Sequence, residues 1–516
     1  MDPEFSTGSE NRQVGRAAGT VGFFTLMSRV LGLIRDMVVA GFFGSGMAAD
    51  AFFVAFRIPN LLRRLFAEGS LSIAFIPVFT EYLQKKSREE AMELVRVTLT
   101  LLSVLLAAVA LAGILFSPWI VRLQAFGFGG AGPKYELTVL LTRITFPYIF
   151  LISIVALFMG VLNSLRRFAA PAAAPVFLNL GIIGAVYWIS PRLSEPVVGL
   201  AVGVIIGGLL QVLLQIPFLK DLGVSLRPAW QPAHPAVKRM GRLMLPAIFG
   251  SAVYQLNQFV GTLLASFLPE GSVSWLYYAD RLVQFPLGVF AIAVSTAALP
   301  SLSRQAGEAG LHAFKQTLSY AMRLVFFITL PAMTGLIVLA PLIVRVLFER
   351  GAFDPAATQM TARALVLYSV GLWAFSGIRV LVAAFYALQD TKTPVKAATM
   401  ALFLNAGLSL ALMGPLAHGG LALALSLASG GQFIVLGLFL QRYAPGWASR
   451  DIVISLARST GASAVMGAVL WWAYRVWWSP GPGTALSELI PGLAGLLALG
   501  CLVYFALMYP LKDIRR

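Results

Sequence analysis

The chain has 516 residues, of which 58% are hydrophobic and only 12% are charged, and its formal net charge is +17. A mean hydropathy of +0.82 excludes a soluble protein of several domains and indicates an integral membrane protein. Apolar runs of about twenty residues recur along the chain, and the alternating pattern of a membrane barrel is absent from the sequence. The single cysteine, Cys501, excludes an internal disulfide framework.

The apolar runs predict an all-α integral membrane protein with about fourteen transmembrane helices. We expect these helices near residues 16–43, 49–82, 92–119, 137–163, 170–190, 197–219, 243–268, 273–303, 317–348, 357–388, 395–413, 419–441, 451–475 and 486–510. Residues 1–14 are predicted to be an expression leader outside the natural protein. Because no small-residue cleavage site follows them, the first apolar run predicts an uncleaved helix.

The basic residues predict the orientation in the membrane. If the N-terminus is cytoplasmic, Lys and Arg gather in the inside loops, for example at Lys85, Lys86 and Arg239, whereas the outside breaks near Pro269 and Pro480 have none close by. The positive-inside rule therefore predicts that both termini are cytoplasmic. This distribution also explains the net charge without a nucleic-acid partner.

An internal repeat is indicated by prolines that recur at one offset. Three pairs are separated by 223 residues, with similar flanking sequences: Pro77 and Pro300, Pro118 and Pro341, Pro171 and Pro394. We expect two six-helix lobes of the same orientation, residues 15–220 and 243–442, joined by a cytoplasmic linker at 221–242. The last two helices, in residues 443–516, have no counterpart. Parallel repeats of this kind are typical of transporters that bind their substrate between two rocking halves.

Charged residues are concentrated in the apolar stretch from Ser28 to Gly69. The stretch contains Arg29, Arg35, Asp36, Asp50, Arg57, Arg63, Arg64 and Glu68. An Arg or Asp at the centre of a membrane helix costs roughly 2.5–3.5 kcal/mol on insertion scales, so such residues are functional-site candidates. Five arginines face three carboxylates here, which leaves a surplus of two positive charges.

Helical spacing gives partners for some of these charges. Arg29 and Asp36 share a helix face and Arg35 is rotated by about 120° from Arg29, so Asp36 is placed to balance either arginine. In the next helix we expect one polar stripe, in which Glu68 can pair with Arg64. Pro59 is expected to kink this helix. The stripe consists of Arg57, Asn60, Arg64 and Glu68. The second half contributes fewer charges: Asp280, Arg281, Arg363 and Arg379.

Two interpretations of these arginines remain open. In the first, the arginines pair with local acids or reach the lipid headgroup layer, and we favour this interpretation for Arg57, Arg363 and Arg379. In the second, the arginines bind an anionic ligand, and the charge surplus favours this interpretation for Arg29, Arg35 and Arg63. The planar fork of arginine binds phosphate oxygens bidentately, so a pyrophosphate fits the surplus.

No catalytic set stands out in the sequence. His234, His312 and His418 are scattered without metal-ligand spacing, and no Ser/His/Asp set or paired-carboxylate site is evident. The sequence therefore predicts a non-enzyme without a cofactor.

The charged stretch, SRVLGLIRDMVVAGFFGSGMAADAFFVAFRIPNLLRRLFAEG, closely resembles the MurJ (MviN) family of bacterial lipid II flippases. This family belongs to the multidrug/oligosaccharidyl-lipid/polysaccharide exporter superfamily. The resemblance continues through GSVSWLYYADRLVQFPLGV and QDTKTPVK and covers roughly residues 15 to 440.

The resemblance implies a fourteen-helix fold with two lobes around a cationic cavity, in the bacterial cytoplasmic (inner) membrane. It implies translocation of lipid II, the undecaprenyl-pyrophosphate disaccharide-pentapeptide, to the outer leaflet. The last two helices would form a groove for the lipid tail, and we expect a monomer surrounded by membrane lipids. The implied binding residues are Arg29, Arg35, Arg63 and Arg281, their acidic partners Asp36, Asp50 and Glu68, and the neighbouring Asn60 and Arg64.

The resemblance also raises the question of a monovalent ion. Some members of the family carry a sodium site, for which Asp390 and Asn257 are weak candidates in this sequence because their neighbours Tyr386 and Leu256 are poor ligands.

Other functions remain as alternatives. An exporter of another polyprenyl-linked glycan fits the charge pattern equally well, whereas a drug exporter would favour acidic residues in its cavity. A membrane enzyme of cell-wall synthesis would need a catalytic acid in an outer loop, for which Glu270 and Asp354 are the candidates.

Overall fold

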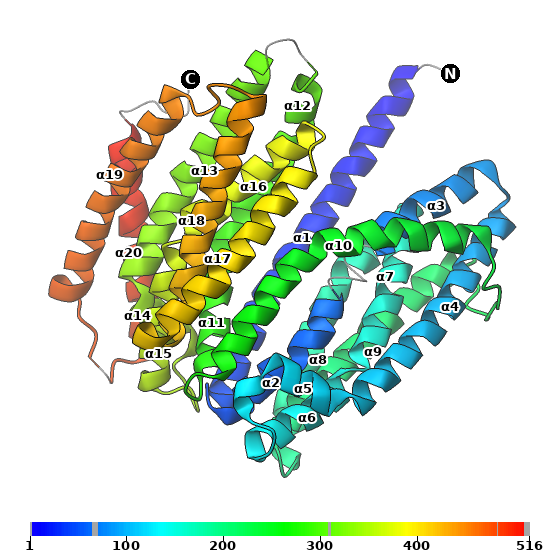
Figure 1. Ribbon diagram of the computed structural model, residues 1–516, viewed down its shortest axis with the longest axis horizontal. Coiled ribbons are helices and arrows are strands. Elements are labelled where there is room, and N and C mark those ends of the chain that lie inside the picture. Colours follow the sequence, from blue (N-terminus) through cyan, green and yellow to red (C-terminus); the bar gives the residue numbers. More distant parts are fainter. Residues whose placement is uncertain (1–2, 64–70, 308–310, 482, 510–516) are drawn as a thin grey trace. The chain divides into compact units, whose positions relative to one another are not determined.

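The computed structural model describes residues 3–63, 71–307, 311–481 and 483–509, and within these ranges every regular element is helical (Figure 1). The chain divides into two compact units, Met1–Gln255 and Leu256–Arg516. The boundary lies within one long helix, α10.

Unit 1 contains nine helices and the first part of α10 among its described residues. They are α1 (Pro3–Phe43), α2 (Met47–Leu62), α3 (Leu71–Lys85), α4 (Arg88–Leu115), α5 (Ser117–Gln124), α6 (Pro133–Thr145), α7 (Tyr148–Ser164), α8 (Ala169–Trp188), α9 (Val198–Asp221) and α10 (Pro235–Ser266), with short 3-10 turns η2 (Phe126–Phe128) and η3 (Ser190–Arg192).

Unit 2 contains the rest of α10 and ten further α-helices among its described residues. They are α11 (Ser272–Pro286), α12 (Ile292–Gln305), α13 (His312–Val338), α14 (Ala340–Phe348), α15 (Pro355–Ser369), α16 (Leu372–Ala387), α17 (Lys392–Leu416), α18 (His418–Tyr443), α19 (Arg450–Trp472) and α20 (Leu486–Met508), with π-helical turns η4 (Leu287–Ala291) and η6 (Ala473–Trp477).

Several of the predicted long helices are interrupted. The runs predicted at 92–119 and 317–348 end in separate short helices, because Pro118 and Pro341 lie in the first turn of α5 and α14. A proline is favoured in the first turn, where its missing N–H is not needed. The run predicted at 137–163 breaks at Pro147, between α6 and α7. The run predicted at 49–82 corresponds to α2 and α3, and residues 64–70 between them lie outside the described residues.

The run predicted at 357–388 is divided into α15 and α16, and the run predicted at 273–303 contains the π-helical turn η4 between α11 and α12. The helix predicted at 243–268 begins earlier, at Pro235. The other predicted helices agree with the structure to within a few residues at most ends, with a clear exception at the N-terminus. Helix α1 begins at Pro3 and therefore includes most of the predicted leader.

Among the described residues, ten helical spans are long and apolar enough to cross a membrane, or eleven if α15 and α16, bent by 43°, form one span. In this count α6 and α7 form one span, Pro133–Ser164, and α11 and α12 form another, Ser272–Gln305.

The paired prolines occupy matching positions in the two units. Pro77 lies inside α3 and Pro300 inside α12. Pro171 and Pro394 are both the third residue of a helix, α8 and α17. Proline therefore constrains the backbone of corresponding helices at positions 223 residues apart.

Small residues allow α8 and α9 to approach closely in unit 1. A Cβ atom added to Gly181 would lie 2.6 Å from both Cα and N of Gly207, closer than such atoms approach one another. Backbone contact of this kind is typical of membrane helix pairs.

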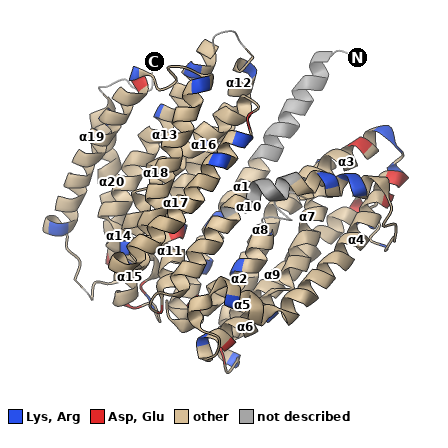
Figure 2. Cartoon of the chain, in the orientation of Figure 1, with Lys and Arg blue, Asp and Glu red and all other residues tan. Residues whose placement is uncertain are grey.

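The segment between α9 and α10 lies along the first turns of α4. Nε of Arg96 donates to the carbonyl oxygen of Arg227 at 3.1 Å, and the backbone N–H of Ala229 donates to Oγ1 of Thr100 at 2.9 Å. At the start of α10, Arg239 forms an ion pair of 2.7 Å with Glu81 at the end of α3. Figure 2 shows charged residues near the adjoining ends of α3 and α4, while most of the length of α4 and α9 carries none.

Candidate functional site

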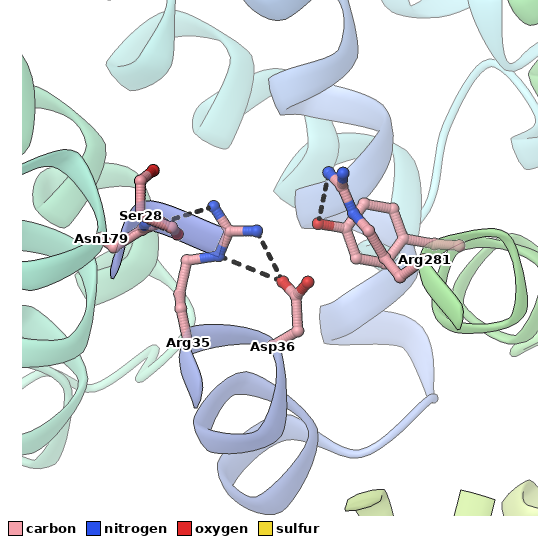
Figure 3. A network of polar contacts seen from close by, with 6 residues as sticks. Ser28, Arg35, Asp36, Asn179 and Arg281 are labelled. Carbon is pink, nitrogen blue, oxygen red and sulfur yellow. Dashed lines mark hydrogen bonds and ion pairs between the residues drawn. The ribbon is translucent and has the colours of Figure 1, made fainter. Parts of the chain in front are cut away.

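Arg35 of α1 lies in a hydrogen-bonded group with Asp36 and with Asn179 of α8 (Figure 3). Its Nε and Nη2 atoms donate to Oδ1 of Asp36 at 3.1 and 2.7 Å, and Nη1 donates to Oδ1 of Asn179 at 3.1 Å. The amide of Asn179 also donates to the carbonyl oxygen of Ser28 at 3.1 Å. The plane of the guanidinium is therefore fixed by two neighbours, and the Asn179 amide ties α8 to α1.

Arg35 is a partner of Asp36. The sequence left Arg29 and Arg35 as alternatives, and the carboxylate of Asp36, which is 4% exposed, accepts two hydrogen bonds from Arg35. Arg29 lies on the same helix, six residues earlier, and is exposed. Two of the predicted arginines thus come from one helix, and Arg35 is held in a defined orientation by its contacts with Asp36 and Asn179.

The predicted polar stripe of the second apolar run is described only in part. Nε of Arg63 donates to Oδ1 of Asn60 at 3.0 Å, so these two predicted residues are in contact at the end of α2. Pro59 lies inside α2, as expected, and is buried. Arg64 and Glu68 lie outside the described residues, and their predicted pairing stays a prediction.

Asp50 has a partner that sequence reasoning missed. Its carboxylate, only 1% exposed, forms an ion pair of 2.8 Å with Nζ of Lys134 at the start of α6. The ammonium of Lys134 also lies 4.2 Å from the ring centre of Phe128. Asp50 therefore joins α2 to α6, a structural role that the prediction of a headgroup contact did not include.

Arg281 of unit 2 contacts an aromatic residue of its own helix, α11. Its Nη2 atom donates to the hydroxyl of Tyr277 at 3.1 Å, and its guanidinium carbon lies 4.8 Å from the centre of that ring (Figure 3). One turn of helix separates the two residues, so the contact follows from i and i+4 spacing. The neighbouring Asp280 accepts a hydrogen bond from Gln284.

The two weak sodium candidates have different partners. Oδ1 of Asn257 accepts a hydrogen bond of 2.8 Å from Asn405 of α17. Oδ1 of Asp390, in the turn between α16 and α17, accepts from the backbone N–H groups of Lys392 and Thr393, and Oδ2 accepts from the hydroxyl of Tyr443. Among the described residues no group of three metal-ligating side chains is found.

The ionisation of Asp390 follows from these contacts. Burial raises the pKa of its carboxyl, but the hydrogen bonds from Thr393, Tyr443 and Lys392 outweigh burial, so the pKa lies below its ordinary value. Asp390, which precedes the N-cap residue Thr391, therefore accepts the first backbone N–H groups of α17 as a charged carboxylate.

The acids considered for an enzyme lie near helix ends. Asp354 is the N-cap of α15, and its Oδ1 atom accepts a hydrogen bond of 2.7 Å from the backbone N–H of Ala357. This capping role explains the residue without catalysis. Glu270 lies in the turn between α10 and α11.

Asn179 is the residue that sequence reasoning missed in this group. It lies within the apolar run AAPVFLNLGIIG, and its side chain is 5% exposed. A lone amide at such a position needs hydrogen-bond partners because an unpaired polar group in an apolar surrounding is costly. That signal was present in the sequence, but it did not identify Arg35 as the partner.

Comparisons with known proteins identify the family. The sequence profile described as Lipid II flippase MurJ matches residues 39–487. A probable lipid II flippase MurJ of Vibrio cholerae is 42% identical, and a lipid II flippase MurJ of Burkholderia cenocepacia is 38% identical; each alignment covers 96% of this chain and 96% of the relative.

Solved structures agree with this similarity. A lipid II flippase MurJ in an inward closed conformation superposes with a TM-score of 0.80 at 27% identity, covering 96% of this chain and 99% of that chain. An inward-facing multidrug resistance transporter of the MATE family has a TM-score of 0.69 at 15% identity, covering 84% and 99%, which shows a shared fold alone. The long match to the profile and to curated relatives, together with the MurJ structure, shows that this chain belongs to the MurJ family of lipid II flippases.

Proposed function

We propose that this multi-pass membrane protein moves lipid II from the inner to the outer leaflet of the bacterial cytoplasmic membrane by alternating access. Membership of the MurJ family supports the substrate and the reaction class. A flippase is a transporter, so the prediction of a non-enzyme is confirmed and the cell-wall enzyme alternative is wrong. The MATE-like fold supports alternating access.

The observation that carries the proposed binding chemistry is the orientation of Arg35. Asp36 and Asn179 hold its guanidinium in one plane within an apolar region of the chain. A preorganised guanidinium binds phosphate oxygens more strongly than a mobile one, because less side-chain entropy is lost on binding. We therefore propose that the pyrophosphate of lipid II contacts Arg35.

The other proposed contacts rest on residue chemistry. Arg29 of α1 and Arg63 at the end of α2 supply further positive charge in unit 1, and Arg281 supplies it in unit 2. Asn60 orients Arg63 through its hydrogen bond. The contribution of Arg64 and Glu68 remains a sequence-based proposal.

The finer architecture is also a proposal. We infer fourteen transmembrane helices, with six-helix lobes at 15–220 and 243–442, a cytoplasmic linker at 221–242, and a lipid-tail groove formed by helices in 443–516. The matching prolines support the repeat. The distribution of basic residues supports cytoplasmic termini. We expect a monomer, and we propose a monovalent ion for any coupling.

The test is lipid II translocation by variants of Arg35. In cells depleted of other flippases, Arg35→Ala should lower the appearance of lipid II in the outer leaflet by about tenfold or more. A tenfold decrease corresponds to a loss of about 1.4 kcal/mol of stabilisation of the bound pyrophosphate. Asn179→Ala, which removes an orienting neighbour, should give a smaller decrease. Arg88→Ala, at the exposed start of α4, is the matched control and should translocate normally.

Two results would contradict the proposal. Normal translocation by a stably inserted Arg35→Ala variant would exclude the guanidinium from headgroup binding. Equal binding of lipid II and an unrelated polyprenyl-linked glycan to the purified protein would instead favour the alternative of another glycan substrate.

A further inference from the structure

A short helix follows a long one at equivalent points of the two repeats, and each short helix carries an arginine. Helix α5, with the sequence SPWIVRLQ, begins after α4, and α14, with the sequence APLIVRVLF, begins after α13. Arg122 and Arg345 are 223 residues apart, the offset of the paired prolines. The two arginines therefore provide an internal comparison.

In unit 2 the arginine and its neighbours are covered. Nη2 of Arg345 donates to the carbonyl oxygen of Gly481 at 2.8 Å, and Nε lies 3.3 Å from the carboxylate of Glu349. Leu342 and Val346 are buried, with 0% and 7% exposure, and α14 packs against α20. Helix α20 and the turn before it thus contribute to the cover.

In unit 1 the equivalent surface is open. Trp119 and Leu123, which match Leu342 and Val346, are 68% and 69% exposed. Phe126, which stands in place of Glu349, is also exposed. Among the described residues no carboxylate pairs with Arg122, whose guanidinium carbon lies 6.0 Å from the ring centre of Trp119.

The open surface is hollowed around the arginine. A pocket of about 520 Å³ is lined by Trp119, Arg122, Leu123, Phe126, Gly129 and Gly130. A Cβ atom added to Gly130 would lie 2.5 Å from Nη2 of Arg122, so glycine leaves the space that the guanidinium occupies. The pocket therefore combines one cation with exposed apolar walls.

We propose that this pocket binds an anionic phospholipid of the surrounding membrane, with the lipid phosphate on Arg122 and acyl-chain carbons on Trp119 and Leu123. Helix α5 begins two residues after α4, a candidate membrane span, so it lies at the level of a headgroup layer. The exposed Leu111 and Leu115 of α4 continue the apolar surface toward the hydrocarbon. Arginine beside tryptophan is typical of this depth, and guanidinium binds phosphate through charge-assisted hydrogen bonds.

The charge decides between lipid classes. The phosphate of phosphatidylcholine is balanced by its own choline, whereas the phosphate of phosphatidylglycerol is not, so an arginine without a carboxylate favours phosphatidylglycerol. In unit 2 the carboxylate of Glu349 and the backbone carbonyls take the place of that phosphate. This inference is independent of lipid II and of the residues proposed to bind its headgroup.

The first experiment measures phospholipid binding to the purified, delipidated full chain by native mass spectrometry. Phosphatidylglycerol should bind the unaltered protein about three- to tenfold more tightly than it binds Arg122→Gln, and phosphatidylcholine should show no such difference. Arg192→Gln removes an exposed arginine of the same unit, which contacts the carbonyl of Trp188, and is the matched control. Equal phosphatidylglycerol binding by Arg122→Gln and the unaltered protein would overturn the proposal.

The second experiment identifies the occupant in cells. A photoreactive phenylalanine analogue in place of Leu123 should yield an adduct with the mass of a phospholipid, and Arg122→Gln should reduce that adduct. An adduct with another protein alone would overturn the proposal and identify a membrane helix as the cover, by analogy with α20. Lipid II translocation should be unchanged by Arg122→Gln, so failure here and failure of the proposed function give different results.

Discussion

Charged and polar residues in the apolar helices of unit 1 are paired across helices at specific points. Asp50 of α2 pairs with Lys134 of α6, and Asn179 of α8 contacts Arg35 of α1. An unpaired charge in such surroundings is strongly destabilising, whereas a paired one with good geometry is tolerated. These pairs therefore fix which helices are neighbours, in addition to any role in binding.

The pair of Asp50 and Lys134 gives a prediction about stability. Lys134→Met should lower the free energy of unfolding by on the order of 3 kcal/mol, because it leaves a buried carboxylate without the ammonium. The double variant Lys134→Met with Asp50→Asn should recover part of that loss. Thermal unfolding of the purified protein measures both effects.

The control for this experiment is an exposed ion pair. Lys86→Met removes the partner of Glu90 at the start of α4, where both side chains are about half exposed, and should leave the unfolding temperature unchanged. A double variant less stable than Lys134→Met alone would show that the pair is not the source of the effect.

At the scale of elements, glycine and proline determine where helices touch and where they end. Pro118 and Pro341 separate short helices from long ones, and the Oγ atom of Ser87 caps α4 by accepting the backbone N–H of Glu90. Gly181 and Gly207 bring α8 and α9 into backbone contact. The sequence predicted the proline repeat, but not which glycines face one another, because glycine is frequent throughout the chain.

The contact between α8 and α9 can be tested by single substitutions. Gly181→Ala should destabilise the protein by about 1–3 kcal/mol, because the added methyl group meets the backbone of Gly207 and the helices must move apart. Gly407→Ala in α17 is the matched control, since nothing lies within 4 Å of its added Cβ. Thermal unfolding of both variants is the measurement, and equal stability of the two would argue against close packing at Gly181.

At the scale of the whole molecule, the chain is a multi-pass membrane protein whose basic residues predict its orientation. The loop before α4 is basic, and the exposed Ala131 lies in the break between α5 and α6. If both termini are cytoplasmic, these two segments lie on opposite sides of the membrane.

Cysteine labelling tests this orientation. In a Cys501→Ser background, Ala131→Cys should react with a membrane-impermeant maleimide added to intact spheroplasts. Lys86→Cys should react only after the membrane is permeabilised, because we place that loop in the cytoplasm. The reverse pattern would invert the proposed topology and place the termini outside.

The sequence by itself determined the class and the family resemblance, and it predicted the repeat. Twenty-residue apolar runs reflect the thickness of a bilayer, and recurrent prolines mark the backbone directly, so both signals are local and readable along the chain. The unusual charges of α1 and α2 were identified in the same way, because a charge in an apolar run stands out without knowledge of its partner.

Only the tertiary structure decided the partners. Helical periodicity placed Asp36 near both Arg29 and Arg35; the structure shows that Arg35 donates to it, and packing of α8 on α1 brings Asn179 to the same guanidinium. Asp50 and Lys134 are 84 residues apart. Likewise, matching sequences place Arg122 and Arg345 on equivalent helices, but only the second is covered by a turn from the C-terminal helices. Periodicity determines the direction of a side chain from its own helix, whereas its partner depends on which helix packs there.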